Sequence, residues 1–520
     1  MSSPTENSSQ QQAASTANSS QQQAASNENL SQQQAVSTEN SSSIEKQAVS
    51  NENSSQQQTV SVEEQTVSSK EPSSIKKKAY RGAVWTIVGY GGSQGLRFVG
   101  NLILTRLLVP ELFGLMALVN TFRMGLILFS DIGIRPSIIQ SQRSDDPDFL
   151  NTAWTLQALR GGWVWLGCWL IAWPVSQFYA DSRLMWLIPL VGVTAFISGF
   201  NSTSLATLNR KLQIGKLTLF EIVVQGLGLA IMIVWAWLWP SIWALVAGSI
   251  VSTIFKLIWS HRLNSGSSNR IAWDKAAVKE IMTFGVWIFI ATAMMFLANQ
   301  ADRLILGKLF SLELLGIYTV AFTLADLPRQ IVQRLSRQII FPVISNYAGK
   351  LDRKSLRQKI LRKRWFLLMG LSFLVTGLVC FGDFLILALY DERYRQAAWM
   401  LPILALGLWP LILSNTVDQA LYAVGNSKYT ALGNFLKFGY MLLLLPIGYN
   451  QFQMLGAVLV VAFNDLPFYL PISFGLWREK LNCIGQDLIA TLLLVGLISG
   501  VLFIRYHLGW GLPLDELRLN

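Results

Sequence analysis

Five charged side chains lie far from the ends of long apolar segments, and four of them are basic. The basic residues are Arg97, Arg123, Arg329 and Lys437, and the acidic residue is Asp465. A charge near the centre of a lipid bilayer costs about 2.5–3.5 kcal/mol on insertion scales, so it normally faces a cavity or a partner. Guanidinium groups suit phosphate, because arginine offers a planar fork of N–H donors to its oxygens. These residues therefore predict a water-filled cationic cleft that can hold a phosphate or diphosphate group.

A polar stripe within residues 315–340 is the best candidate for a wall of this cleft. Asp326, Gln330, Gln333 and Arg337 follow one another at spacings of four, three and four residues, which places them on one face of a helix. Pro328 lies near the middle of the segment, where a helix can bend and expose carbonyl groups to a cavity. The alternative for Arg337 is that its side chain extends to the inner membrane surface.

The deep charges also have a structural interpretation. Arg97 and Arg123 could join neighbouring helices, with Asp131 as a partner two turns from Arg123. Lys437 and Asp465 belong to adjacent apolar segments and could form an internal ion pair. From the sequence alone, both the cleft and these pairings stay open.

An acidic group that opens onto the cleft could bind a coupling proton or sodium ion. Glu221, Asp418 and Asp465 are the candidates. The chain has no G-x-x-x-x-G-K-[ST] motif, so it does not bind ATP by that route. Three cysteines without metal-ligand spacing and only two histidines predict no metal site. We therefore expect no cofactor, and a driving force that comes from an ion gradient, the membrane potential or the gradient of the substrate itself.

The elements that must position these residues are membrane-spanning helices. The chain is 52% hydrophobic and 14% charged, with a mean hydropathy of +0.38, whereas about a quarter of the residues in a soluble domain are charged. Apolar stretches of about twenty residues, each long enough to cross a bilayer, recur thirteen times. They cover 83–105, 112–134, 154–175, 184–207, 217–239, 242–260, 280–300, 315–340, 365–389, 397–423, 430–449, 454–476 and 487–507. The predicted fold is an all-α polytopic membrane protein.

An internal repeat divides these helices into two halves. LILTRLLVPELFGL at 102–115 returns as LILGKLFSLELLGI at 304–317, with seven of fourteen positions identical and a basic residue shared at Arg106 and Lys308. We call these two stretches the repeated segments. Six apolar segments separate equivalent points, so both copies have the same orientation and form a parallel repeat about an axis along the membrane normal. We expect two six-helix lobes, followed by one extra C-terminal transmembrane helix.

The first 75 residues differ in composition from the rest. An eleven-residue unit that begins SSQQQAASTAN at 8–18 recurs several times without an apolar stripe, which is typical of a disordered polar tail. We expect function to survive removal of this tail. The predicted organisation is therefore a Gln/Ser-rich tail, a first lobe, a cytoplasmic linker, a second lobe, and an extra helix with a C-terminal tail, at 1–75, 76–261, 262–278, 279–478 and 479–520.

Lysine and arginine residues are concentrated in alternate connections between the apolar segments, most densely at 350–364. By the positive-inside rule this pattern predicts a cytoplasmic N-terminus in the inner membrane. The run 350–364 itself predicts a short amphipathic helix on the membrane surface. Because topology and anionic lipid explain the net charge of +12, nucleic acid is not an expected partner.

Several local sequences resemble one known family. RGAVWTIVGYGGSQGLRFVGNLILTRLLVPELFGLMALV at 81–119 resembles the opening of Wzx-like polysaccharide exporters, which belong to the multidrug/oligosaccharidyl-lipid/polysaccharide flippase superfamily. SDIGIRPSIIQ, LNRKLQIGKLTLFE, NQADRLILGKLFSLELLGIYTVAF and IIFPVISNY are similar to later parts of that family, at 130–140, 208–221, 299–322 and 339–347. The resemblance covers about residues 80–505, and the repetitive N-terminal tail lies outside it.

The resemblance implies a transporter rather than an enzyme. Members of the family move lipid-linked saccharides across the cytoplasmic membrane, so the implied substrate is a lipid-diphosphate-linked oligosaccharide that is flipped outward by alternating access of the two lobes. The implied partners are membrane lipids, a polysaccharide polymerase and chain-length machinery. One alternative is an ion-coupled multidrug or cation antiporter of the same superfamily, which would need an acidic, aromatic cavity. Another is a membrane-embedded glycosyltransferase or polymerase, which would need acidic residues on a large exposed loop.

Overall fold

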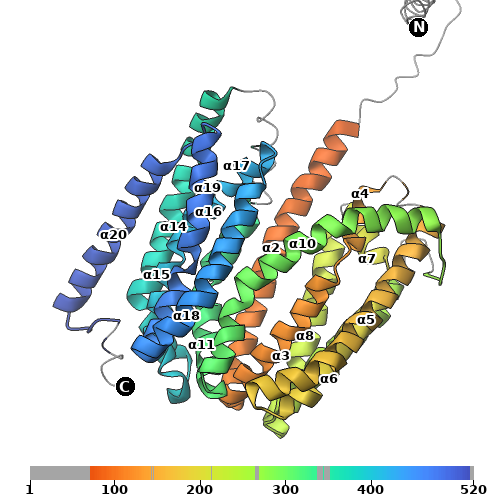
Figure 1. Ribbon diagram of the computed structural model, residues 1–520, viewed down its shortest axis with the longest axis horizontal. Coiled ribbons are helices and arrows are strands. Elements are labelled where there is room, and N and C mark those ends of the chain that lie inside the picture. The colour runs from red at the N-terminus through yellow and green to blue at the C-terminus, as the bar shows by residue number, and fades with distance from the viewer. Residues whose placement is uncertain are drawn as a thin grey trace, which may run out of the picture. The chain divides into compact units, whose positions relative to one another are not determined.

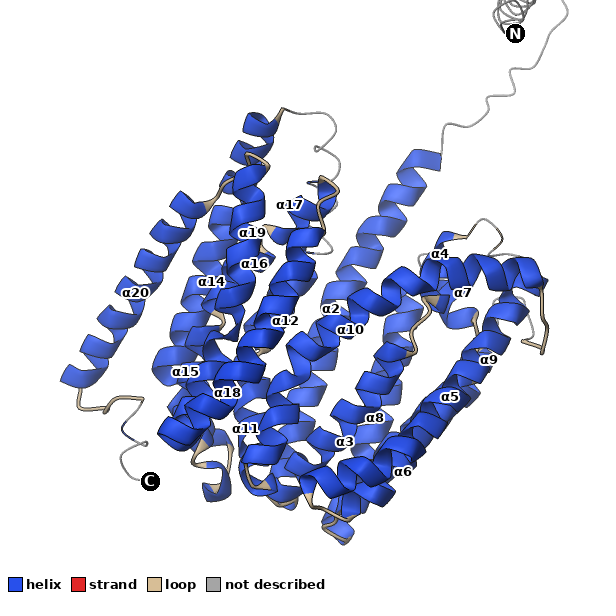
Figure 2. Cartoon of the chain, in the orientation of Figure 1, coloured by secondary structure: helices blue, strands red, loops and turns tan. Residues whose placement is uncertain are grey.

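The computed structural model describes residues 71–141, 143, 146–211, 213–263, 269–336, 344, 352–513 and 515 of the chain. Arg337 and most of the N-terminal tail fall outside these residues. From Ile75 to Asn520 the chain forms one compact unit. Its described residues form helices joined by turns and loops, and none of them lies in a strand (Figure 2). The predicted all-α fold class is confirmed.

The helices follow one another along the whole described chain. They are α2 (Glu71–Leu107), α3 (Pro110–Phe129), α4 (Ile134–Gln140), α5 (Pro147–Tyr179), α6 (Arg183–Gly199), α7 (Ser204–Arg210), α8 (Ile214–Leu238), α9 (Ile242–Arg262), α10 (Lys275–Leu309), α11 (Leu312–Ala325), α12 (Leu327–Leu335), α14 (Arg353–Leu389), η2 (Glu392–Tyr394), α15 (Ala397–Gly407), α16 (Trp409–Asn415), α17 (Asp418–Ala423), α18 (Lys428–Ala462), η3 (Phe463–Asp465), α19 (Leu466–Arg478) and α20 (Ile484–His507).

Each of the thirteen predicted apolar segments coincides with one or more of these helices. Among the described residues, seven helices are long and apolar enough to cross a membrane by themselves, or eight when α6 and α7, which meet at 62°, count as one span. Other predicted spans are broken, as at the 397–423 segment, which consists of α15, α16 and α17. The total of thirteen crossings stays a prediction.

Helix α18 covers two predicted segments. It is not one regular helix, because Phe452 and Gln453 have non-helical backbone angles and Gln453 has a φ of 50°. This break falls in the connection that we expect between 449 and 454. Gly448 and Gly456 lie on either side of it, and a Cβ on Gly456 would stand 2.0 Å from the carbonyl oxygen of Gly448. The two glycines therefore let the chain fold back on itself at this turn.

Helices α10 and α11 lie between the two groups of helices that precede and follow them (Figure 1). Helix α10 packs on α3 and α5 of the first group and on α18 of the second, while α11 packs on α3 and α15. Ala277 and Ile281, in the first turns of α10, are buried in an apolar cluster with α4 and α5 residues. The start of α10 therefore contacts the first lobe, although we expect the second lobe to begin at 279; the lobe boundary remains a prediction.

Among the described residues, one large apolar cluster joins helices α2–α9 to helices α11–α18 at one end of the molecule. We call this end outer, because it holds the α2–α3 turn that the charge pattern places outside the cell; it lies at the bottom of Figure 1. One cluster there joins Leu108 and Leu115 of the first lobe to Leu306, Leu315 and Tyr318 of the second. Toward the inner end the described apolar residues form separate clusters in α12–α20 and in α4–α10. The lobes are thus held together mainly at the outer end.

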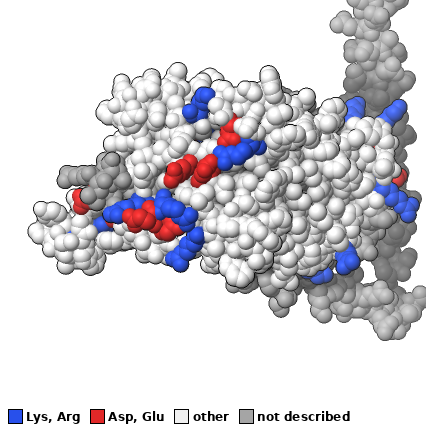
Figure 3. All heavy atoms as spheres, turned by 90° about the horizontal axis from the view of Figure 1, so that it is seen from below, with Lys and Arg blue, Asp and Glu red and all other residues white. Residues whose placement is uncertain are grey.

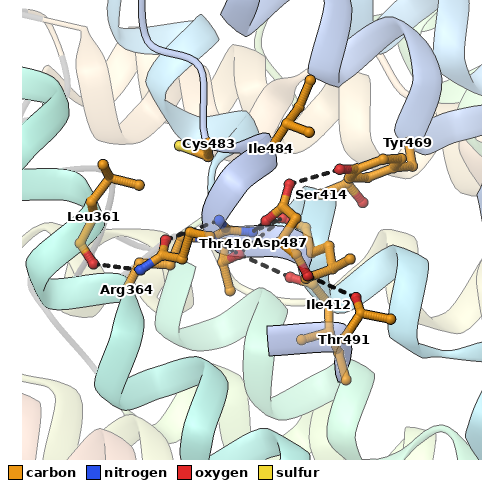
Figure 4. Close-up of polar contacts among 12 residues, drawn as sticks. Leu361, Arg364, Ile412, Ser414, Thr416, Tyr469, Cys483, Ile484, Asp487 and Thr491 are labelled. Atoms are coloured by element: carbon orange, nitrogen blue, oxygen red, sulfur yellow. Dashed lines mark hydrogen bonds and ion pairs between the residues drawn. The ribbon is translucent and has the colours of Figure 1, made fainter. Parts of the chain in front are cut away.

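The extra helix α20 is fixed to α14 by two buried ion pairs. Near the start of both helices, Arg364 Nη2 lies 2.5 Å from Asp487 Oδ1 and donates to the carbonyl of Leu413. Tyr469 donates to the other oxygen of Asp487 (Figure 4). Near their ends, Arg505 pairs with Asp383. The two helices therefore run parallel.

From the sequence we expected the basic run 350–364 to form a separate surface helix. Its described residues do not form one. Residues from Arg353 onward form the first turns of α14 itself, which continues to Leu389. Arg362 and Lys363 are exposed, whereas Arg364 is buried. The prediction was wrong because the helix that begins at Arg353 continues without a break into the apolar segment, and Arg364 within the run is buried beside Asp487.

Candidate functional site

Two of the deep basic residues share one buried carboxylate. Asp465 Oδ1 lies 2.6 Å from Lys437 Nζ, and Asp465 Oδ2 lies 2.7 Å from Arg329 Nη2. Only 9% of Arg329, 2% of Lys437 and 1% of Asp465 is exposed. The internal Lys437–Asp465 pair that the sequence suggested is present, and Arg329 joins it as a third member. Because the three residues come from α12, α18 and η3, the cluster ties together three elements of the second lobe.

Breaks in two predicted segments place these side chains. The 315–340 segment divides at Asp326, and Pro328 occupies the first turn of α12. Arg329 Nε then lies 3.0 Å from Asp326 Oδ1, so this cation has a second acidic partner. Asp465 ends the short η3 turn between α18 and α19. With Asp326 included, the cluster holds two cations and two carboxylates, and it is neutral rather than cationic.

A polar cavity of about 430 Å³ opens beside the cluster within the second lobe. Lys437 and Asp465 form part of its wall, and Asp418 lies on another part and is buried. The other lining residues are Met295, Asn299, Gln333, Ser336, Leu411, Asn415, Gln419, Tyr422, Thr430, Asn434 and Phe468. Most of these residues carry amide, hydroxyl or carboxylate groups, while apolar atoms make up the larger part of the cavity surface.

The polar stripe of the 315–340 segment divides between two environments. Gln333 lines the cavity, whereas Gln330 faces α2 of the first lobe. The Gln330 side-chain oxygen accepts hydrogen bonds from Gln94 Nε2 at 2.8 Å and from the Tyr90 hydroxyl at 3.3 Å. Arg334 lies over the ring of Tyr90 at 4.2 Å. A polar contact between the two lobes therefore lies near the level of the charge cluster.

Arg97 and Arg123 do not join the cluster. Arg97 is exposed on α2 and makes no ion pair with any described residue. It follows Tyr90 and Gln94 by seven and three residues, so it extends the face of α2 that meets α12. Arg123 Nη2 donates to Asn120 at 3.4 Å, and its Nε is buried without a hydrogen bond to the described part of the chain.

The pairing of Arg123 with Asp131 that we considered is wrong. Asp131 lies 3.8 Å from Arg160 instead, a residue of α5 that also donates to the carbonyl of Ile127. Arg123 and Asp131 are eight positions apart, and α3 ends at Phe129 before it reaches Asp131. The carboxylate therefore lies beyond the helix on which the expected spacing depends.

The acidic candidates for ion coupling also separate. Asp418 begins α17, faces the cavity and accepts a hydrogen bond from Gln419 at 3.1 Å. Asp465 carries the two basic partners described above. Glu221 is exposed on α8 and does not line this cavity. Arg337, the last member of the polar stripe, lies outside the described residues.

Sequence reasoning missed the uncharged polar residues of the site. Thr430, Asn434 and Lys437 recur at spacings of four and three on α18, which places them on one helix face toward the cavity. Asn415 and Asp418 supply a second group just before and within α17. Polar side chains at helical spacing inside an apolar segment were the signal that could have identified them.

Comparison with solved structures defines the class of protein. The fold is similar to that of "Lipid II flippase MurJ, inward closed conformation", with a TM-score of 0.61 at 13% identity over 81% of this chain and 92% of that one. It is also similar to an inward-facing MATE multidrug transporter of the MOP superfamily, with a TM-score of 0.59 at 13% identity over 74% and 94% of the two chains. The chain thus has the fold of the MOP-superfamily transporters, as the sequence resemblance implied.

Sequence comparison gives the family. The model of the family described as "Polysaccharide biosynthesis protein" matches residues 103–399, more than half of the chain, and the chain belongs to this family. It is 22% identical to the succinoglycan biosynthesis transport protein ExoT of Rhizobium meliloti (strain 1021), over 68% of this chain and 71% of ExoT. It is 20% identical to the lipopolysaccharide biosynthesis protein WzxC of Escherichia coli (strain K12), over 74% and 77% of the two chains. The predicted relationship to polysaccharide exporters is confirmed.

Proposed function

We propose that this protein flips a lipid-diphosphate-linked oligosaccharide from the cytoplasmic to the outer face of the inner membrane by alternating access of its two lobes. The observation that carries the proposal is an MOP-superfamily fold in a chain of the polysaccharide biosynthesis family. Relatives named for succinoglycan transport and lipopolysaccharide biosynthesis support the same substrate class.

Arg97 and Arg123 are the basic residues best suited to the diphosphate in this proposal. They are the two deep cations without an acidic partner among the described residues, so their charge is available to a ligand. A buried pair such as Arg329–Asp465 would have to give up an existing partner first. We therefore assign the first contact with diphosphate to α2 and α3, and we assign Arg329 and Lys437 to a later step or to holding the second lobe together.

The cavity of the second lobe is the proposed site of ion coupling. Asp418 lines this cavity beside amide and hydroxyl side chains and accepts a hydrogen bond from Gln419. A proton or a sodium ion bound there would neutralise the Asp418 carboxylate in a wall that Lys437 and Asp465 also line. Asp465 is a weaker candidate, because Lys437 and Arg329 already neutralise it. Glu221 is exposed and is the least suited of the three.

The first prediction concerns lipid movement in reconstituted liposomes. With a fluorescent lipid-diphosphate-sugar as substrate, we expect Arg97→Gln and Arg123→Gln each to slow transbilayer movement about tenfold, because a hydrogen bond to a charged group is worth about 1.5–3 kcal/mol. Arg362→Gln, which removes an exposed cation at the start of α14, is the matched control and should leave the rate unchanged.

Two results would count against this proposal. Unchanged movement in both Arg97→Gln and Arg123→Gln would contradict the assignment of these arginines to the diphosphate. No movement even by the wild-type protein, across several saccharides, together with ion-driven efflux of a cationic drug, would favour the antiporter. We propose a polysaccharide polymerase and chain-length proteins as partners of the flippase, since they would consume its product.

A further inference from the structure

The repeated segments contact each other in the folded protein. A Cβ on Gly114 would stand 1.9 Å from the carbonyl oxygen of Leu312, and a Cβ on Gly316 would stand 1.9 Å from that of Pro110. Gly114 and Gly316 are equivalent positions of the repeat, as are Pro110 and Leu312. The contact is therefore reciprocal, and the pseudo-symmetry axis passes between the two glycines. Only glycine permits this close approach of α3 and α11.

The basic residue of each repeated segment reaches the opposite lobe. Arg106 Nη2 donates to the carbonyl of Leu389 at the end of α14, at 3.3 Å. Lys308 Nζ donates to the carbonyl of Phe178 at the end of α5 and lies 5.1 Å from the Phe178 ring centroid. The last carbonyls of a helix have no partner within the helix and lie at its negative end, so a cation satisfies them well. Each lobe thus caps a helix of the other by the same device.

Three further hydrogen bonds cross between the lobes at this end. Arg393 of the second lobe donates to the carbonyls of Thr105 and Arg106, at 3.3 and 3.2 Å. The Tyr179 hydroxyl of the first lobe donates to the carbonyl of Leu304 at 2.8 Å. All these contacts involve the repeated segments or the ends of α5 and α14. The view from the outer end shows groups of basic and acidic side chains that stand beside one another on a surface that is mostly neither (Figure 3).

We propose that the repeated segments form the outer gate of the transporter, with Arg106 and Lys308 as its two latches. The gate is closed in this structure, because the large apolar cluster that joins α2–α9 to α11–α18 lies at the outer end. This inference rests on the proposed alternating access: release of a substrate outside requires the Gly114–Gly316 crossing and both latches to separate. It also explains why a basic residue and a glycine recur in register, since each copy performs the same task toward the other lobe.

The latches suit a gate that must open repeatedly. Arg106, Lys308 and Arg393 are exposed, so water can replace each lost hydrogen bond when the lobes part. The glycine crossing supplies close packing without side chains that would interlock. A permanent lobe interface would instead favour buried pairs such as the one between Arg364 and Asp487.

The test measures how often the outer gate opens. The three native cysteines are first replaced, and a single cysteine is introduced at position 94, on the face of α2 that meets α12. A membrane-impermeant maleimide added to intact spheroplasts then labels this cysteine only when it is accessible from outside. We expect Arg106→Gln combined with Lys308→Gln to raise the labelling rate about tenfold, because both lost hydrogen bonds are open to water and the two together shift a two-state equilibrium by about that factor. Gly114→Ala should raise it further.

Matched controls separate the gate from general damage. Arg183 lies at the same end, and its partners among the described residues, Glu111 and Asp181, both belong to the first lobe, so Arg183→Gln should leave labelling unchanged. A Cβ on Gly91 would meet nothing within 4 Å, so Gly91→Ala should also behave as wild type.

Wild-type labelling in the Arg106→Gln/Lys308→Gln variant would overturn the latch assignment; this variant replaces exposed side chains and should fold. Labelling that rises equally in Arg183→Gln would also overturn it, since that arginine does not bridge the lobes. The labelling assay needs no lipid-linked saccharide, so it tests the gate independently of the substrate. If labelling changes as expected but the protein moves no lipid-linked saccharide, the proposed substrate is refuted and the gate is not.

Discussion

At the scale of single residues, Asp465 decides the charge state of the site. One carboxylate holds Lys437 at 2.6 Å and Arg329 at 2.7 Å, and all three side chains are buried. Buried charges are tolerated when they are paired, and removing one partner is what destabilises them. Because Arg329 also has Asp326, Lys437 depends on Asp465 more than Arg329 does.

This dependence gives the next prediction. Asp465→Asn leaves Lys437 without a carboxylate, and we expect it to lower the stability of the detergent-solubilised protein by about 3–5 kcal/mol. Lys437→Met removes the unpaired charge, so the double variant should be more stable than Asp465→Asn alone. The thermal unfolding midpoint of the four proteins of this double-mutant cycle measures the effect.

The cycle is additive if Lys437→Met lowers stability equally with and without Asp465. An additive cycle would show that the two side chains do not interact in the detergent-solubilised protein. Arg362→Met is the control for loss of a cation, because Arg362 is exposed. Its midpoint should match that of the wild type.

At the scale of elements, α14 and α20 carry complementary charges at both ends. Arg364 and Asp383 are nineteen positions apart on α14, and Asp487 and Arg505 are eighteen apart on α20. Two parallel helices with a rise of about 1.5 Å per residue therefore bring both opposite-charge pairs together at once. The extra helix is in this way an integral part of the second lobe.

Charge exchange tests the attachment of α20. Either Arg364→Asp or Asp487→Arg alone places two like charges in a buried contact. Each should lower the free energy of unfolding by about 3–5 kcal/mol and strongly reduce the yield of folded protein. The double exchange restores an ion pair and should recover part of the loss. Folded yield by fluorescence-detected size exclusion measures this, with Arg362→Asp as the exposed control; no recovery in the double variant would mean that the pair is not what fixes α20.

The elements were predictable and their polar partners were not. Long apolar runs fix where helices cross a bilayer, because twenty apolar residues have few alternatives there, and each of the thirteen predicted segments lies on helix. A pairing such as Arg364 with Asp487 joins residues far apart in sequence, and apolar periodicity carries no information about it. The neutral character of the site was missed for a different reason: Asp326 lies only three positions before Arg329, but it was counted as a wall of the cleft and not as the partner of that arginine.

At the scale of the whole chain from Ile75 onward, the pairs between α14 and α20 also bear on topology. These two helices run parallel, since their starts pair through Arg364 and their ends through Arg505. In the predicted scheme α14 and α20 are the ninth and thirteenth crossings, and both lead outward when the N-terminus is cytoplasmic. An even number of crossings between α14 and α20 would have made them antiparallel, so the charge pairs agree with the three crossings predicted between them.

Sided labelling tests this topology directly. We expect Leu512→Cys, just beyond α20, to react with an impermeant maleimide added outside spheroplasts, and Arg478→Cys, at the end of α19, to react only in inside-out vesicles. Both positions are exposed, so failure to react would reflect sidedness rather than burial. Reaction of Leu512→Cys from the inside alone would invert the orientation of α20, and with it that of α14, because the two ion pairs require both helices to point the same way. The outer gate would then lie on the cytoplasmic side, and the structure would represent the state open to the exterior.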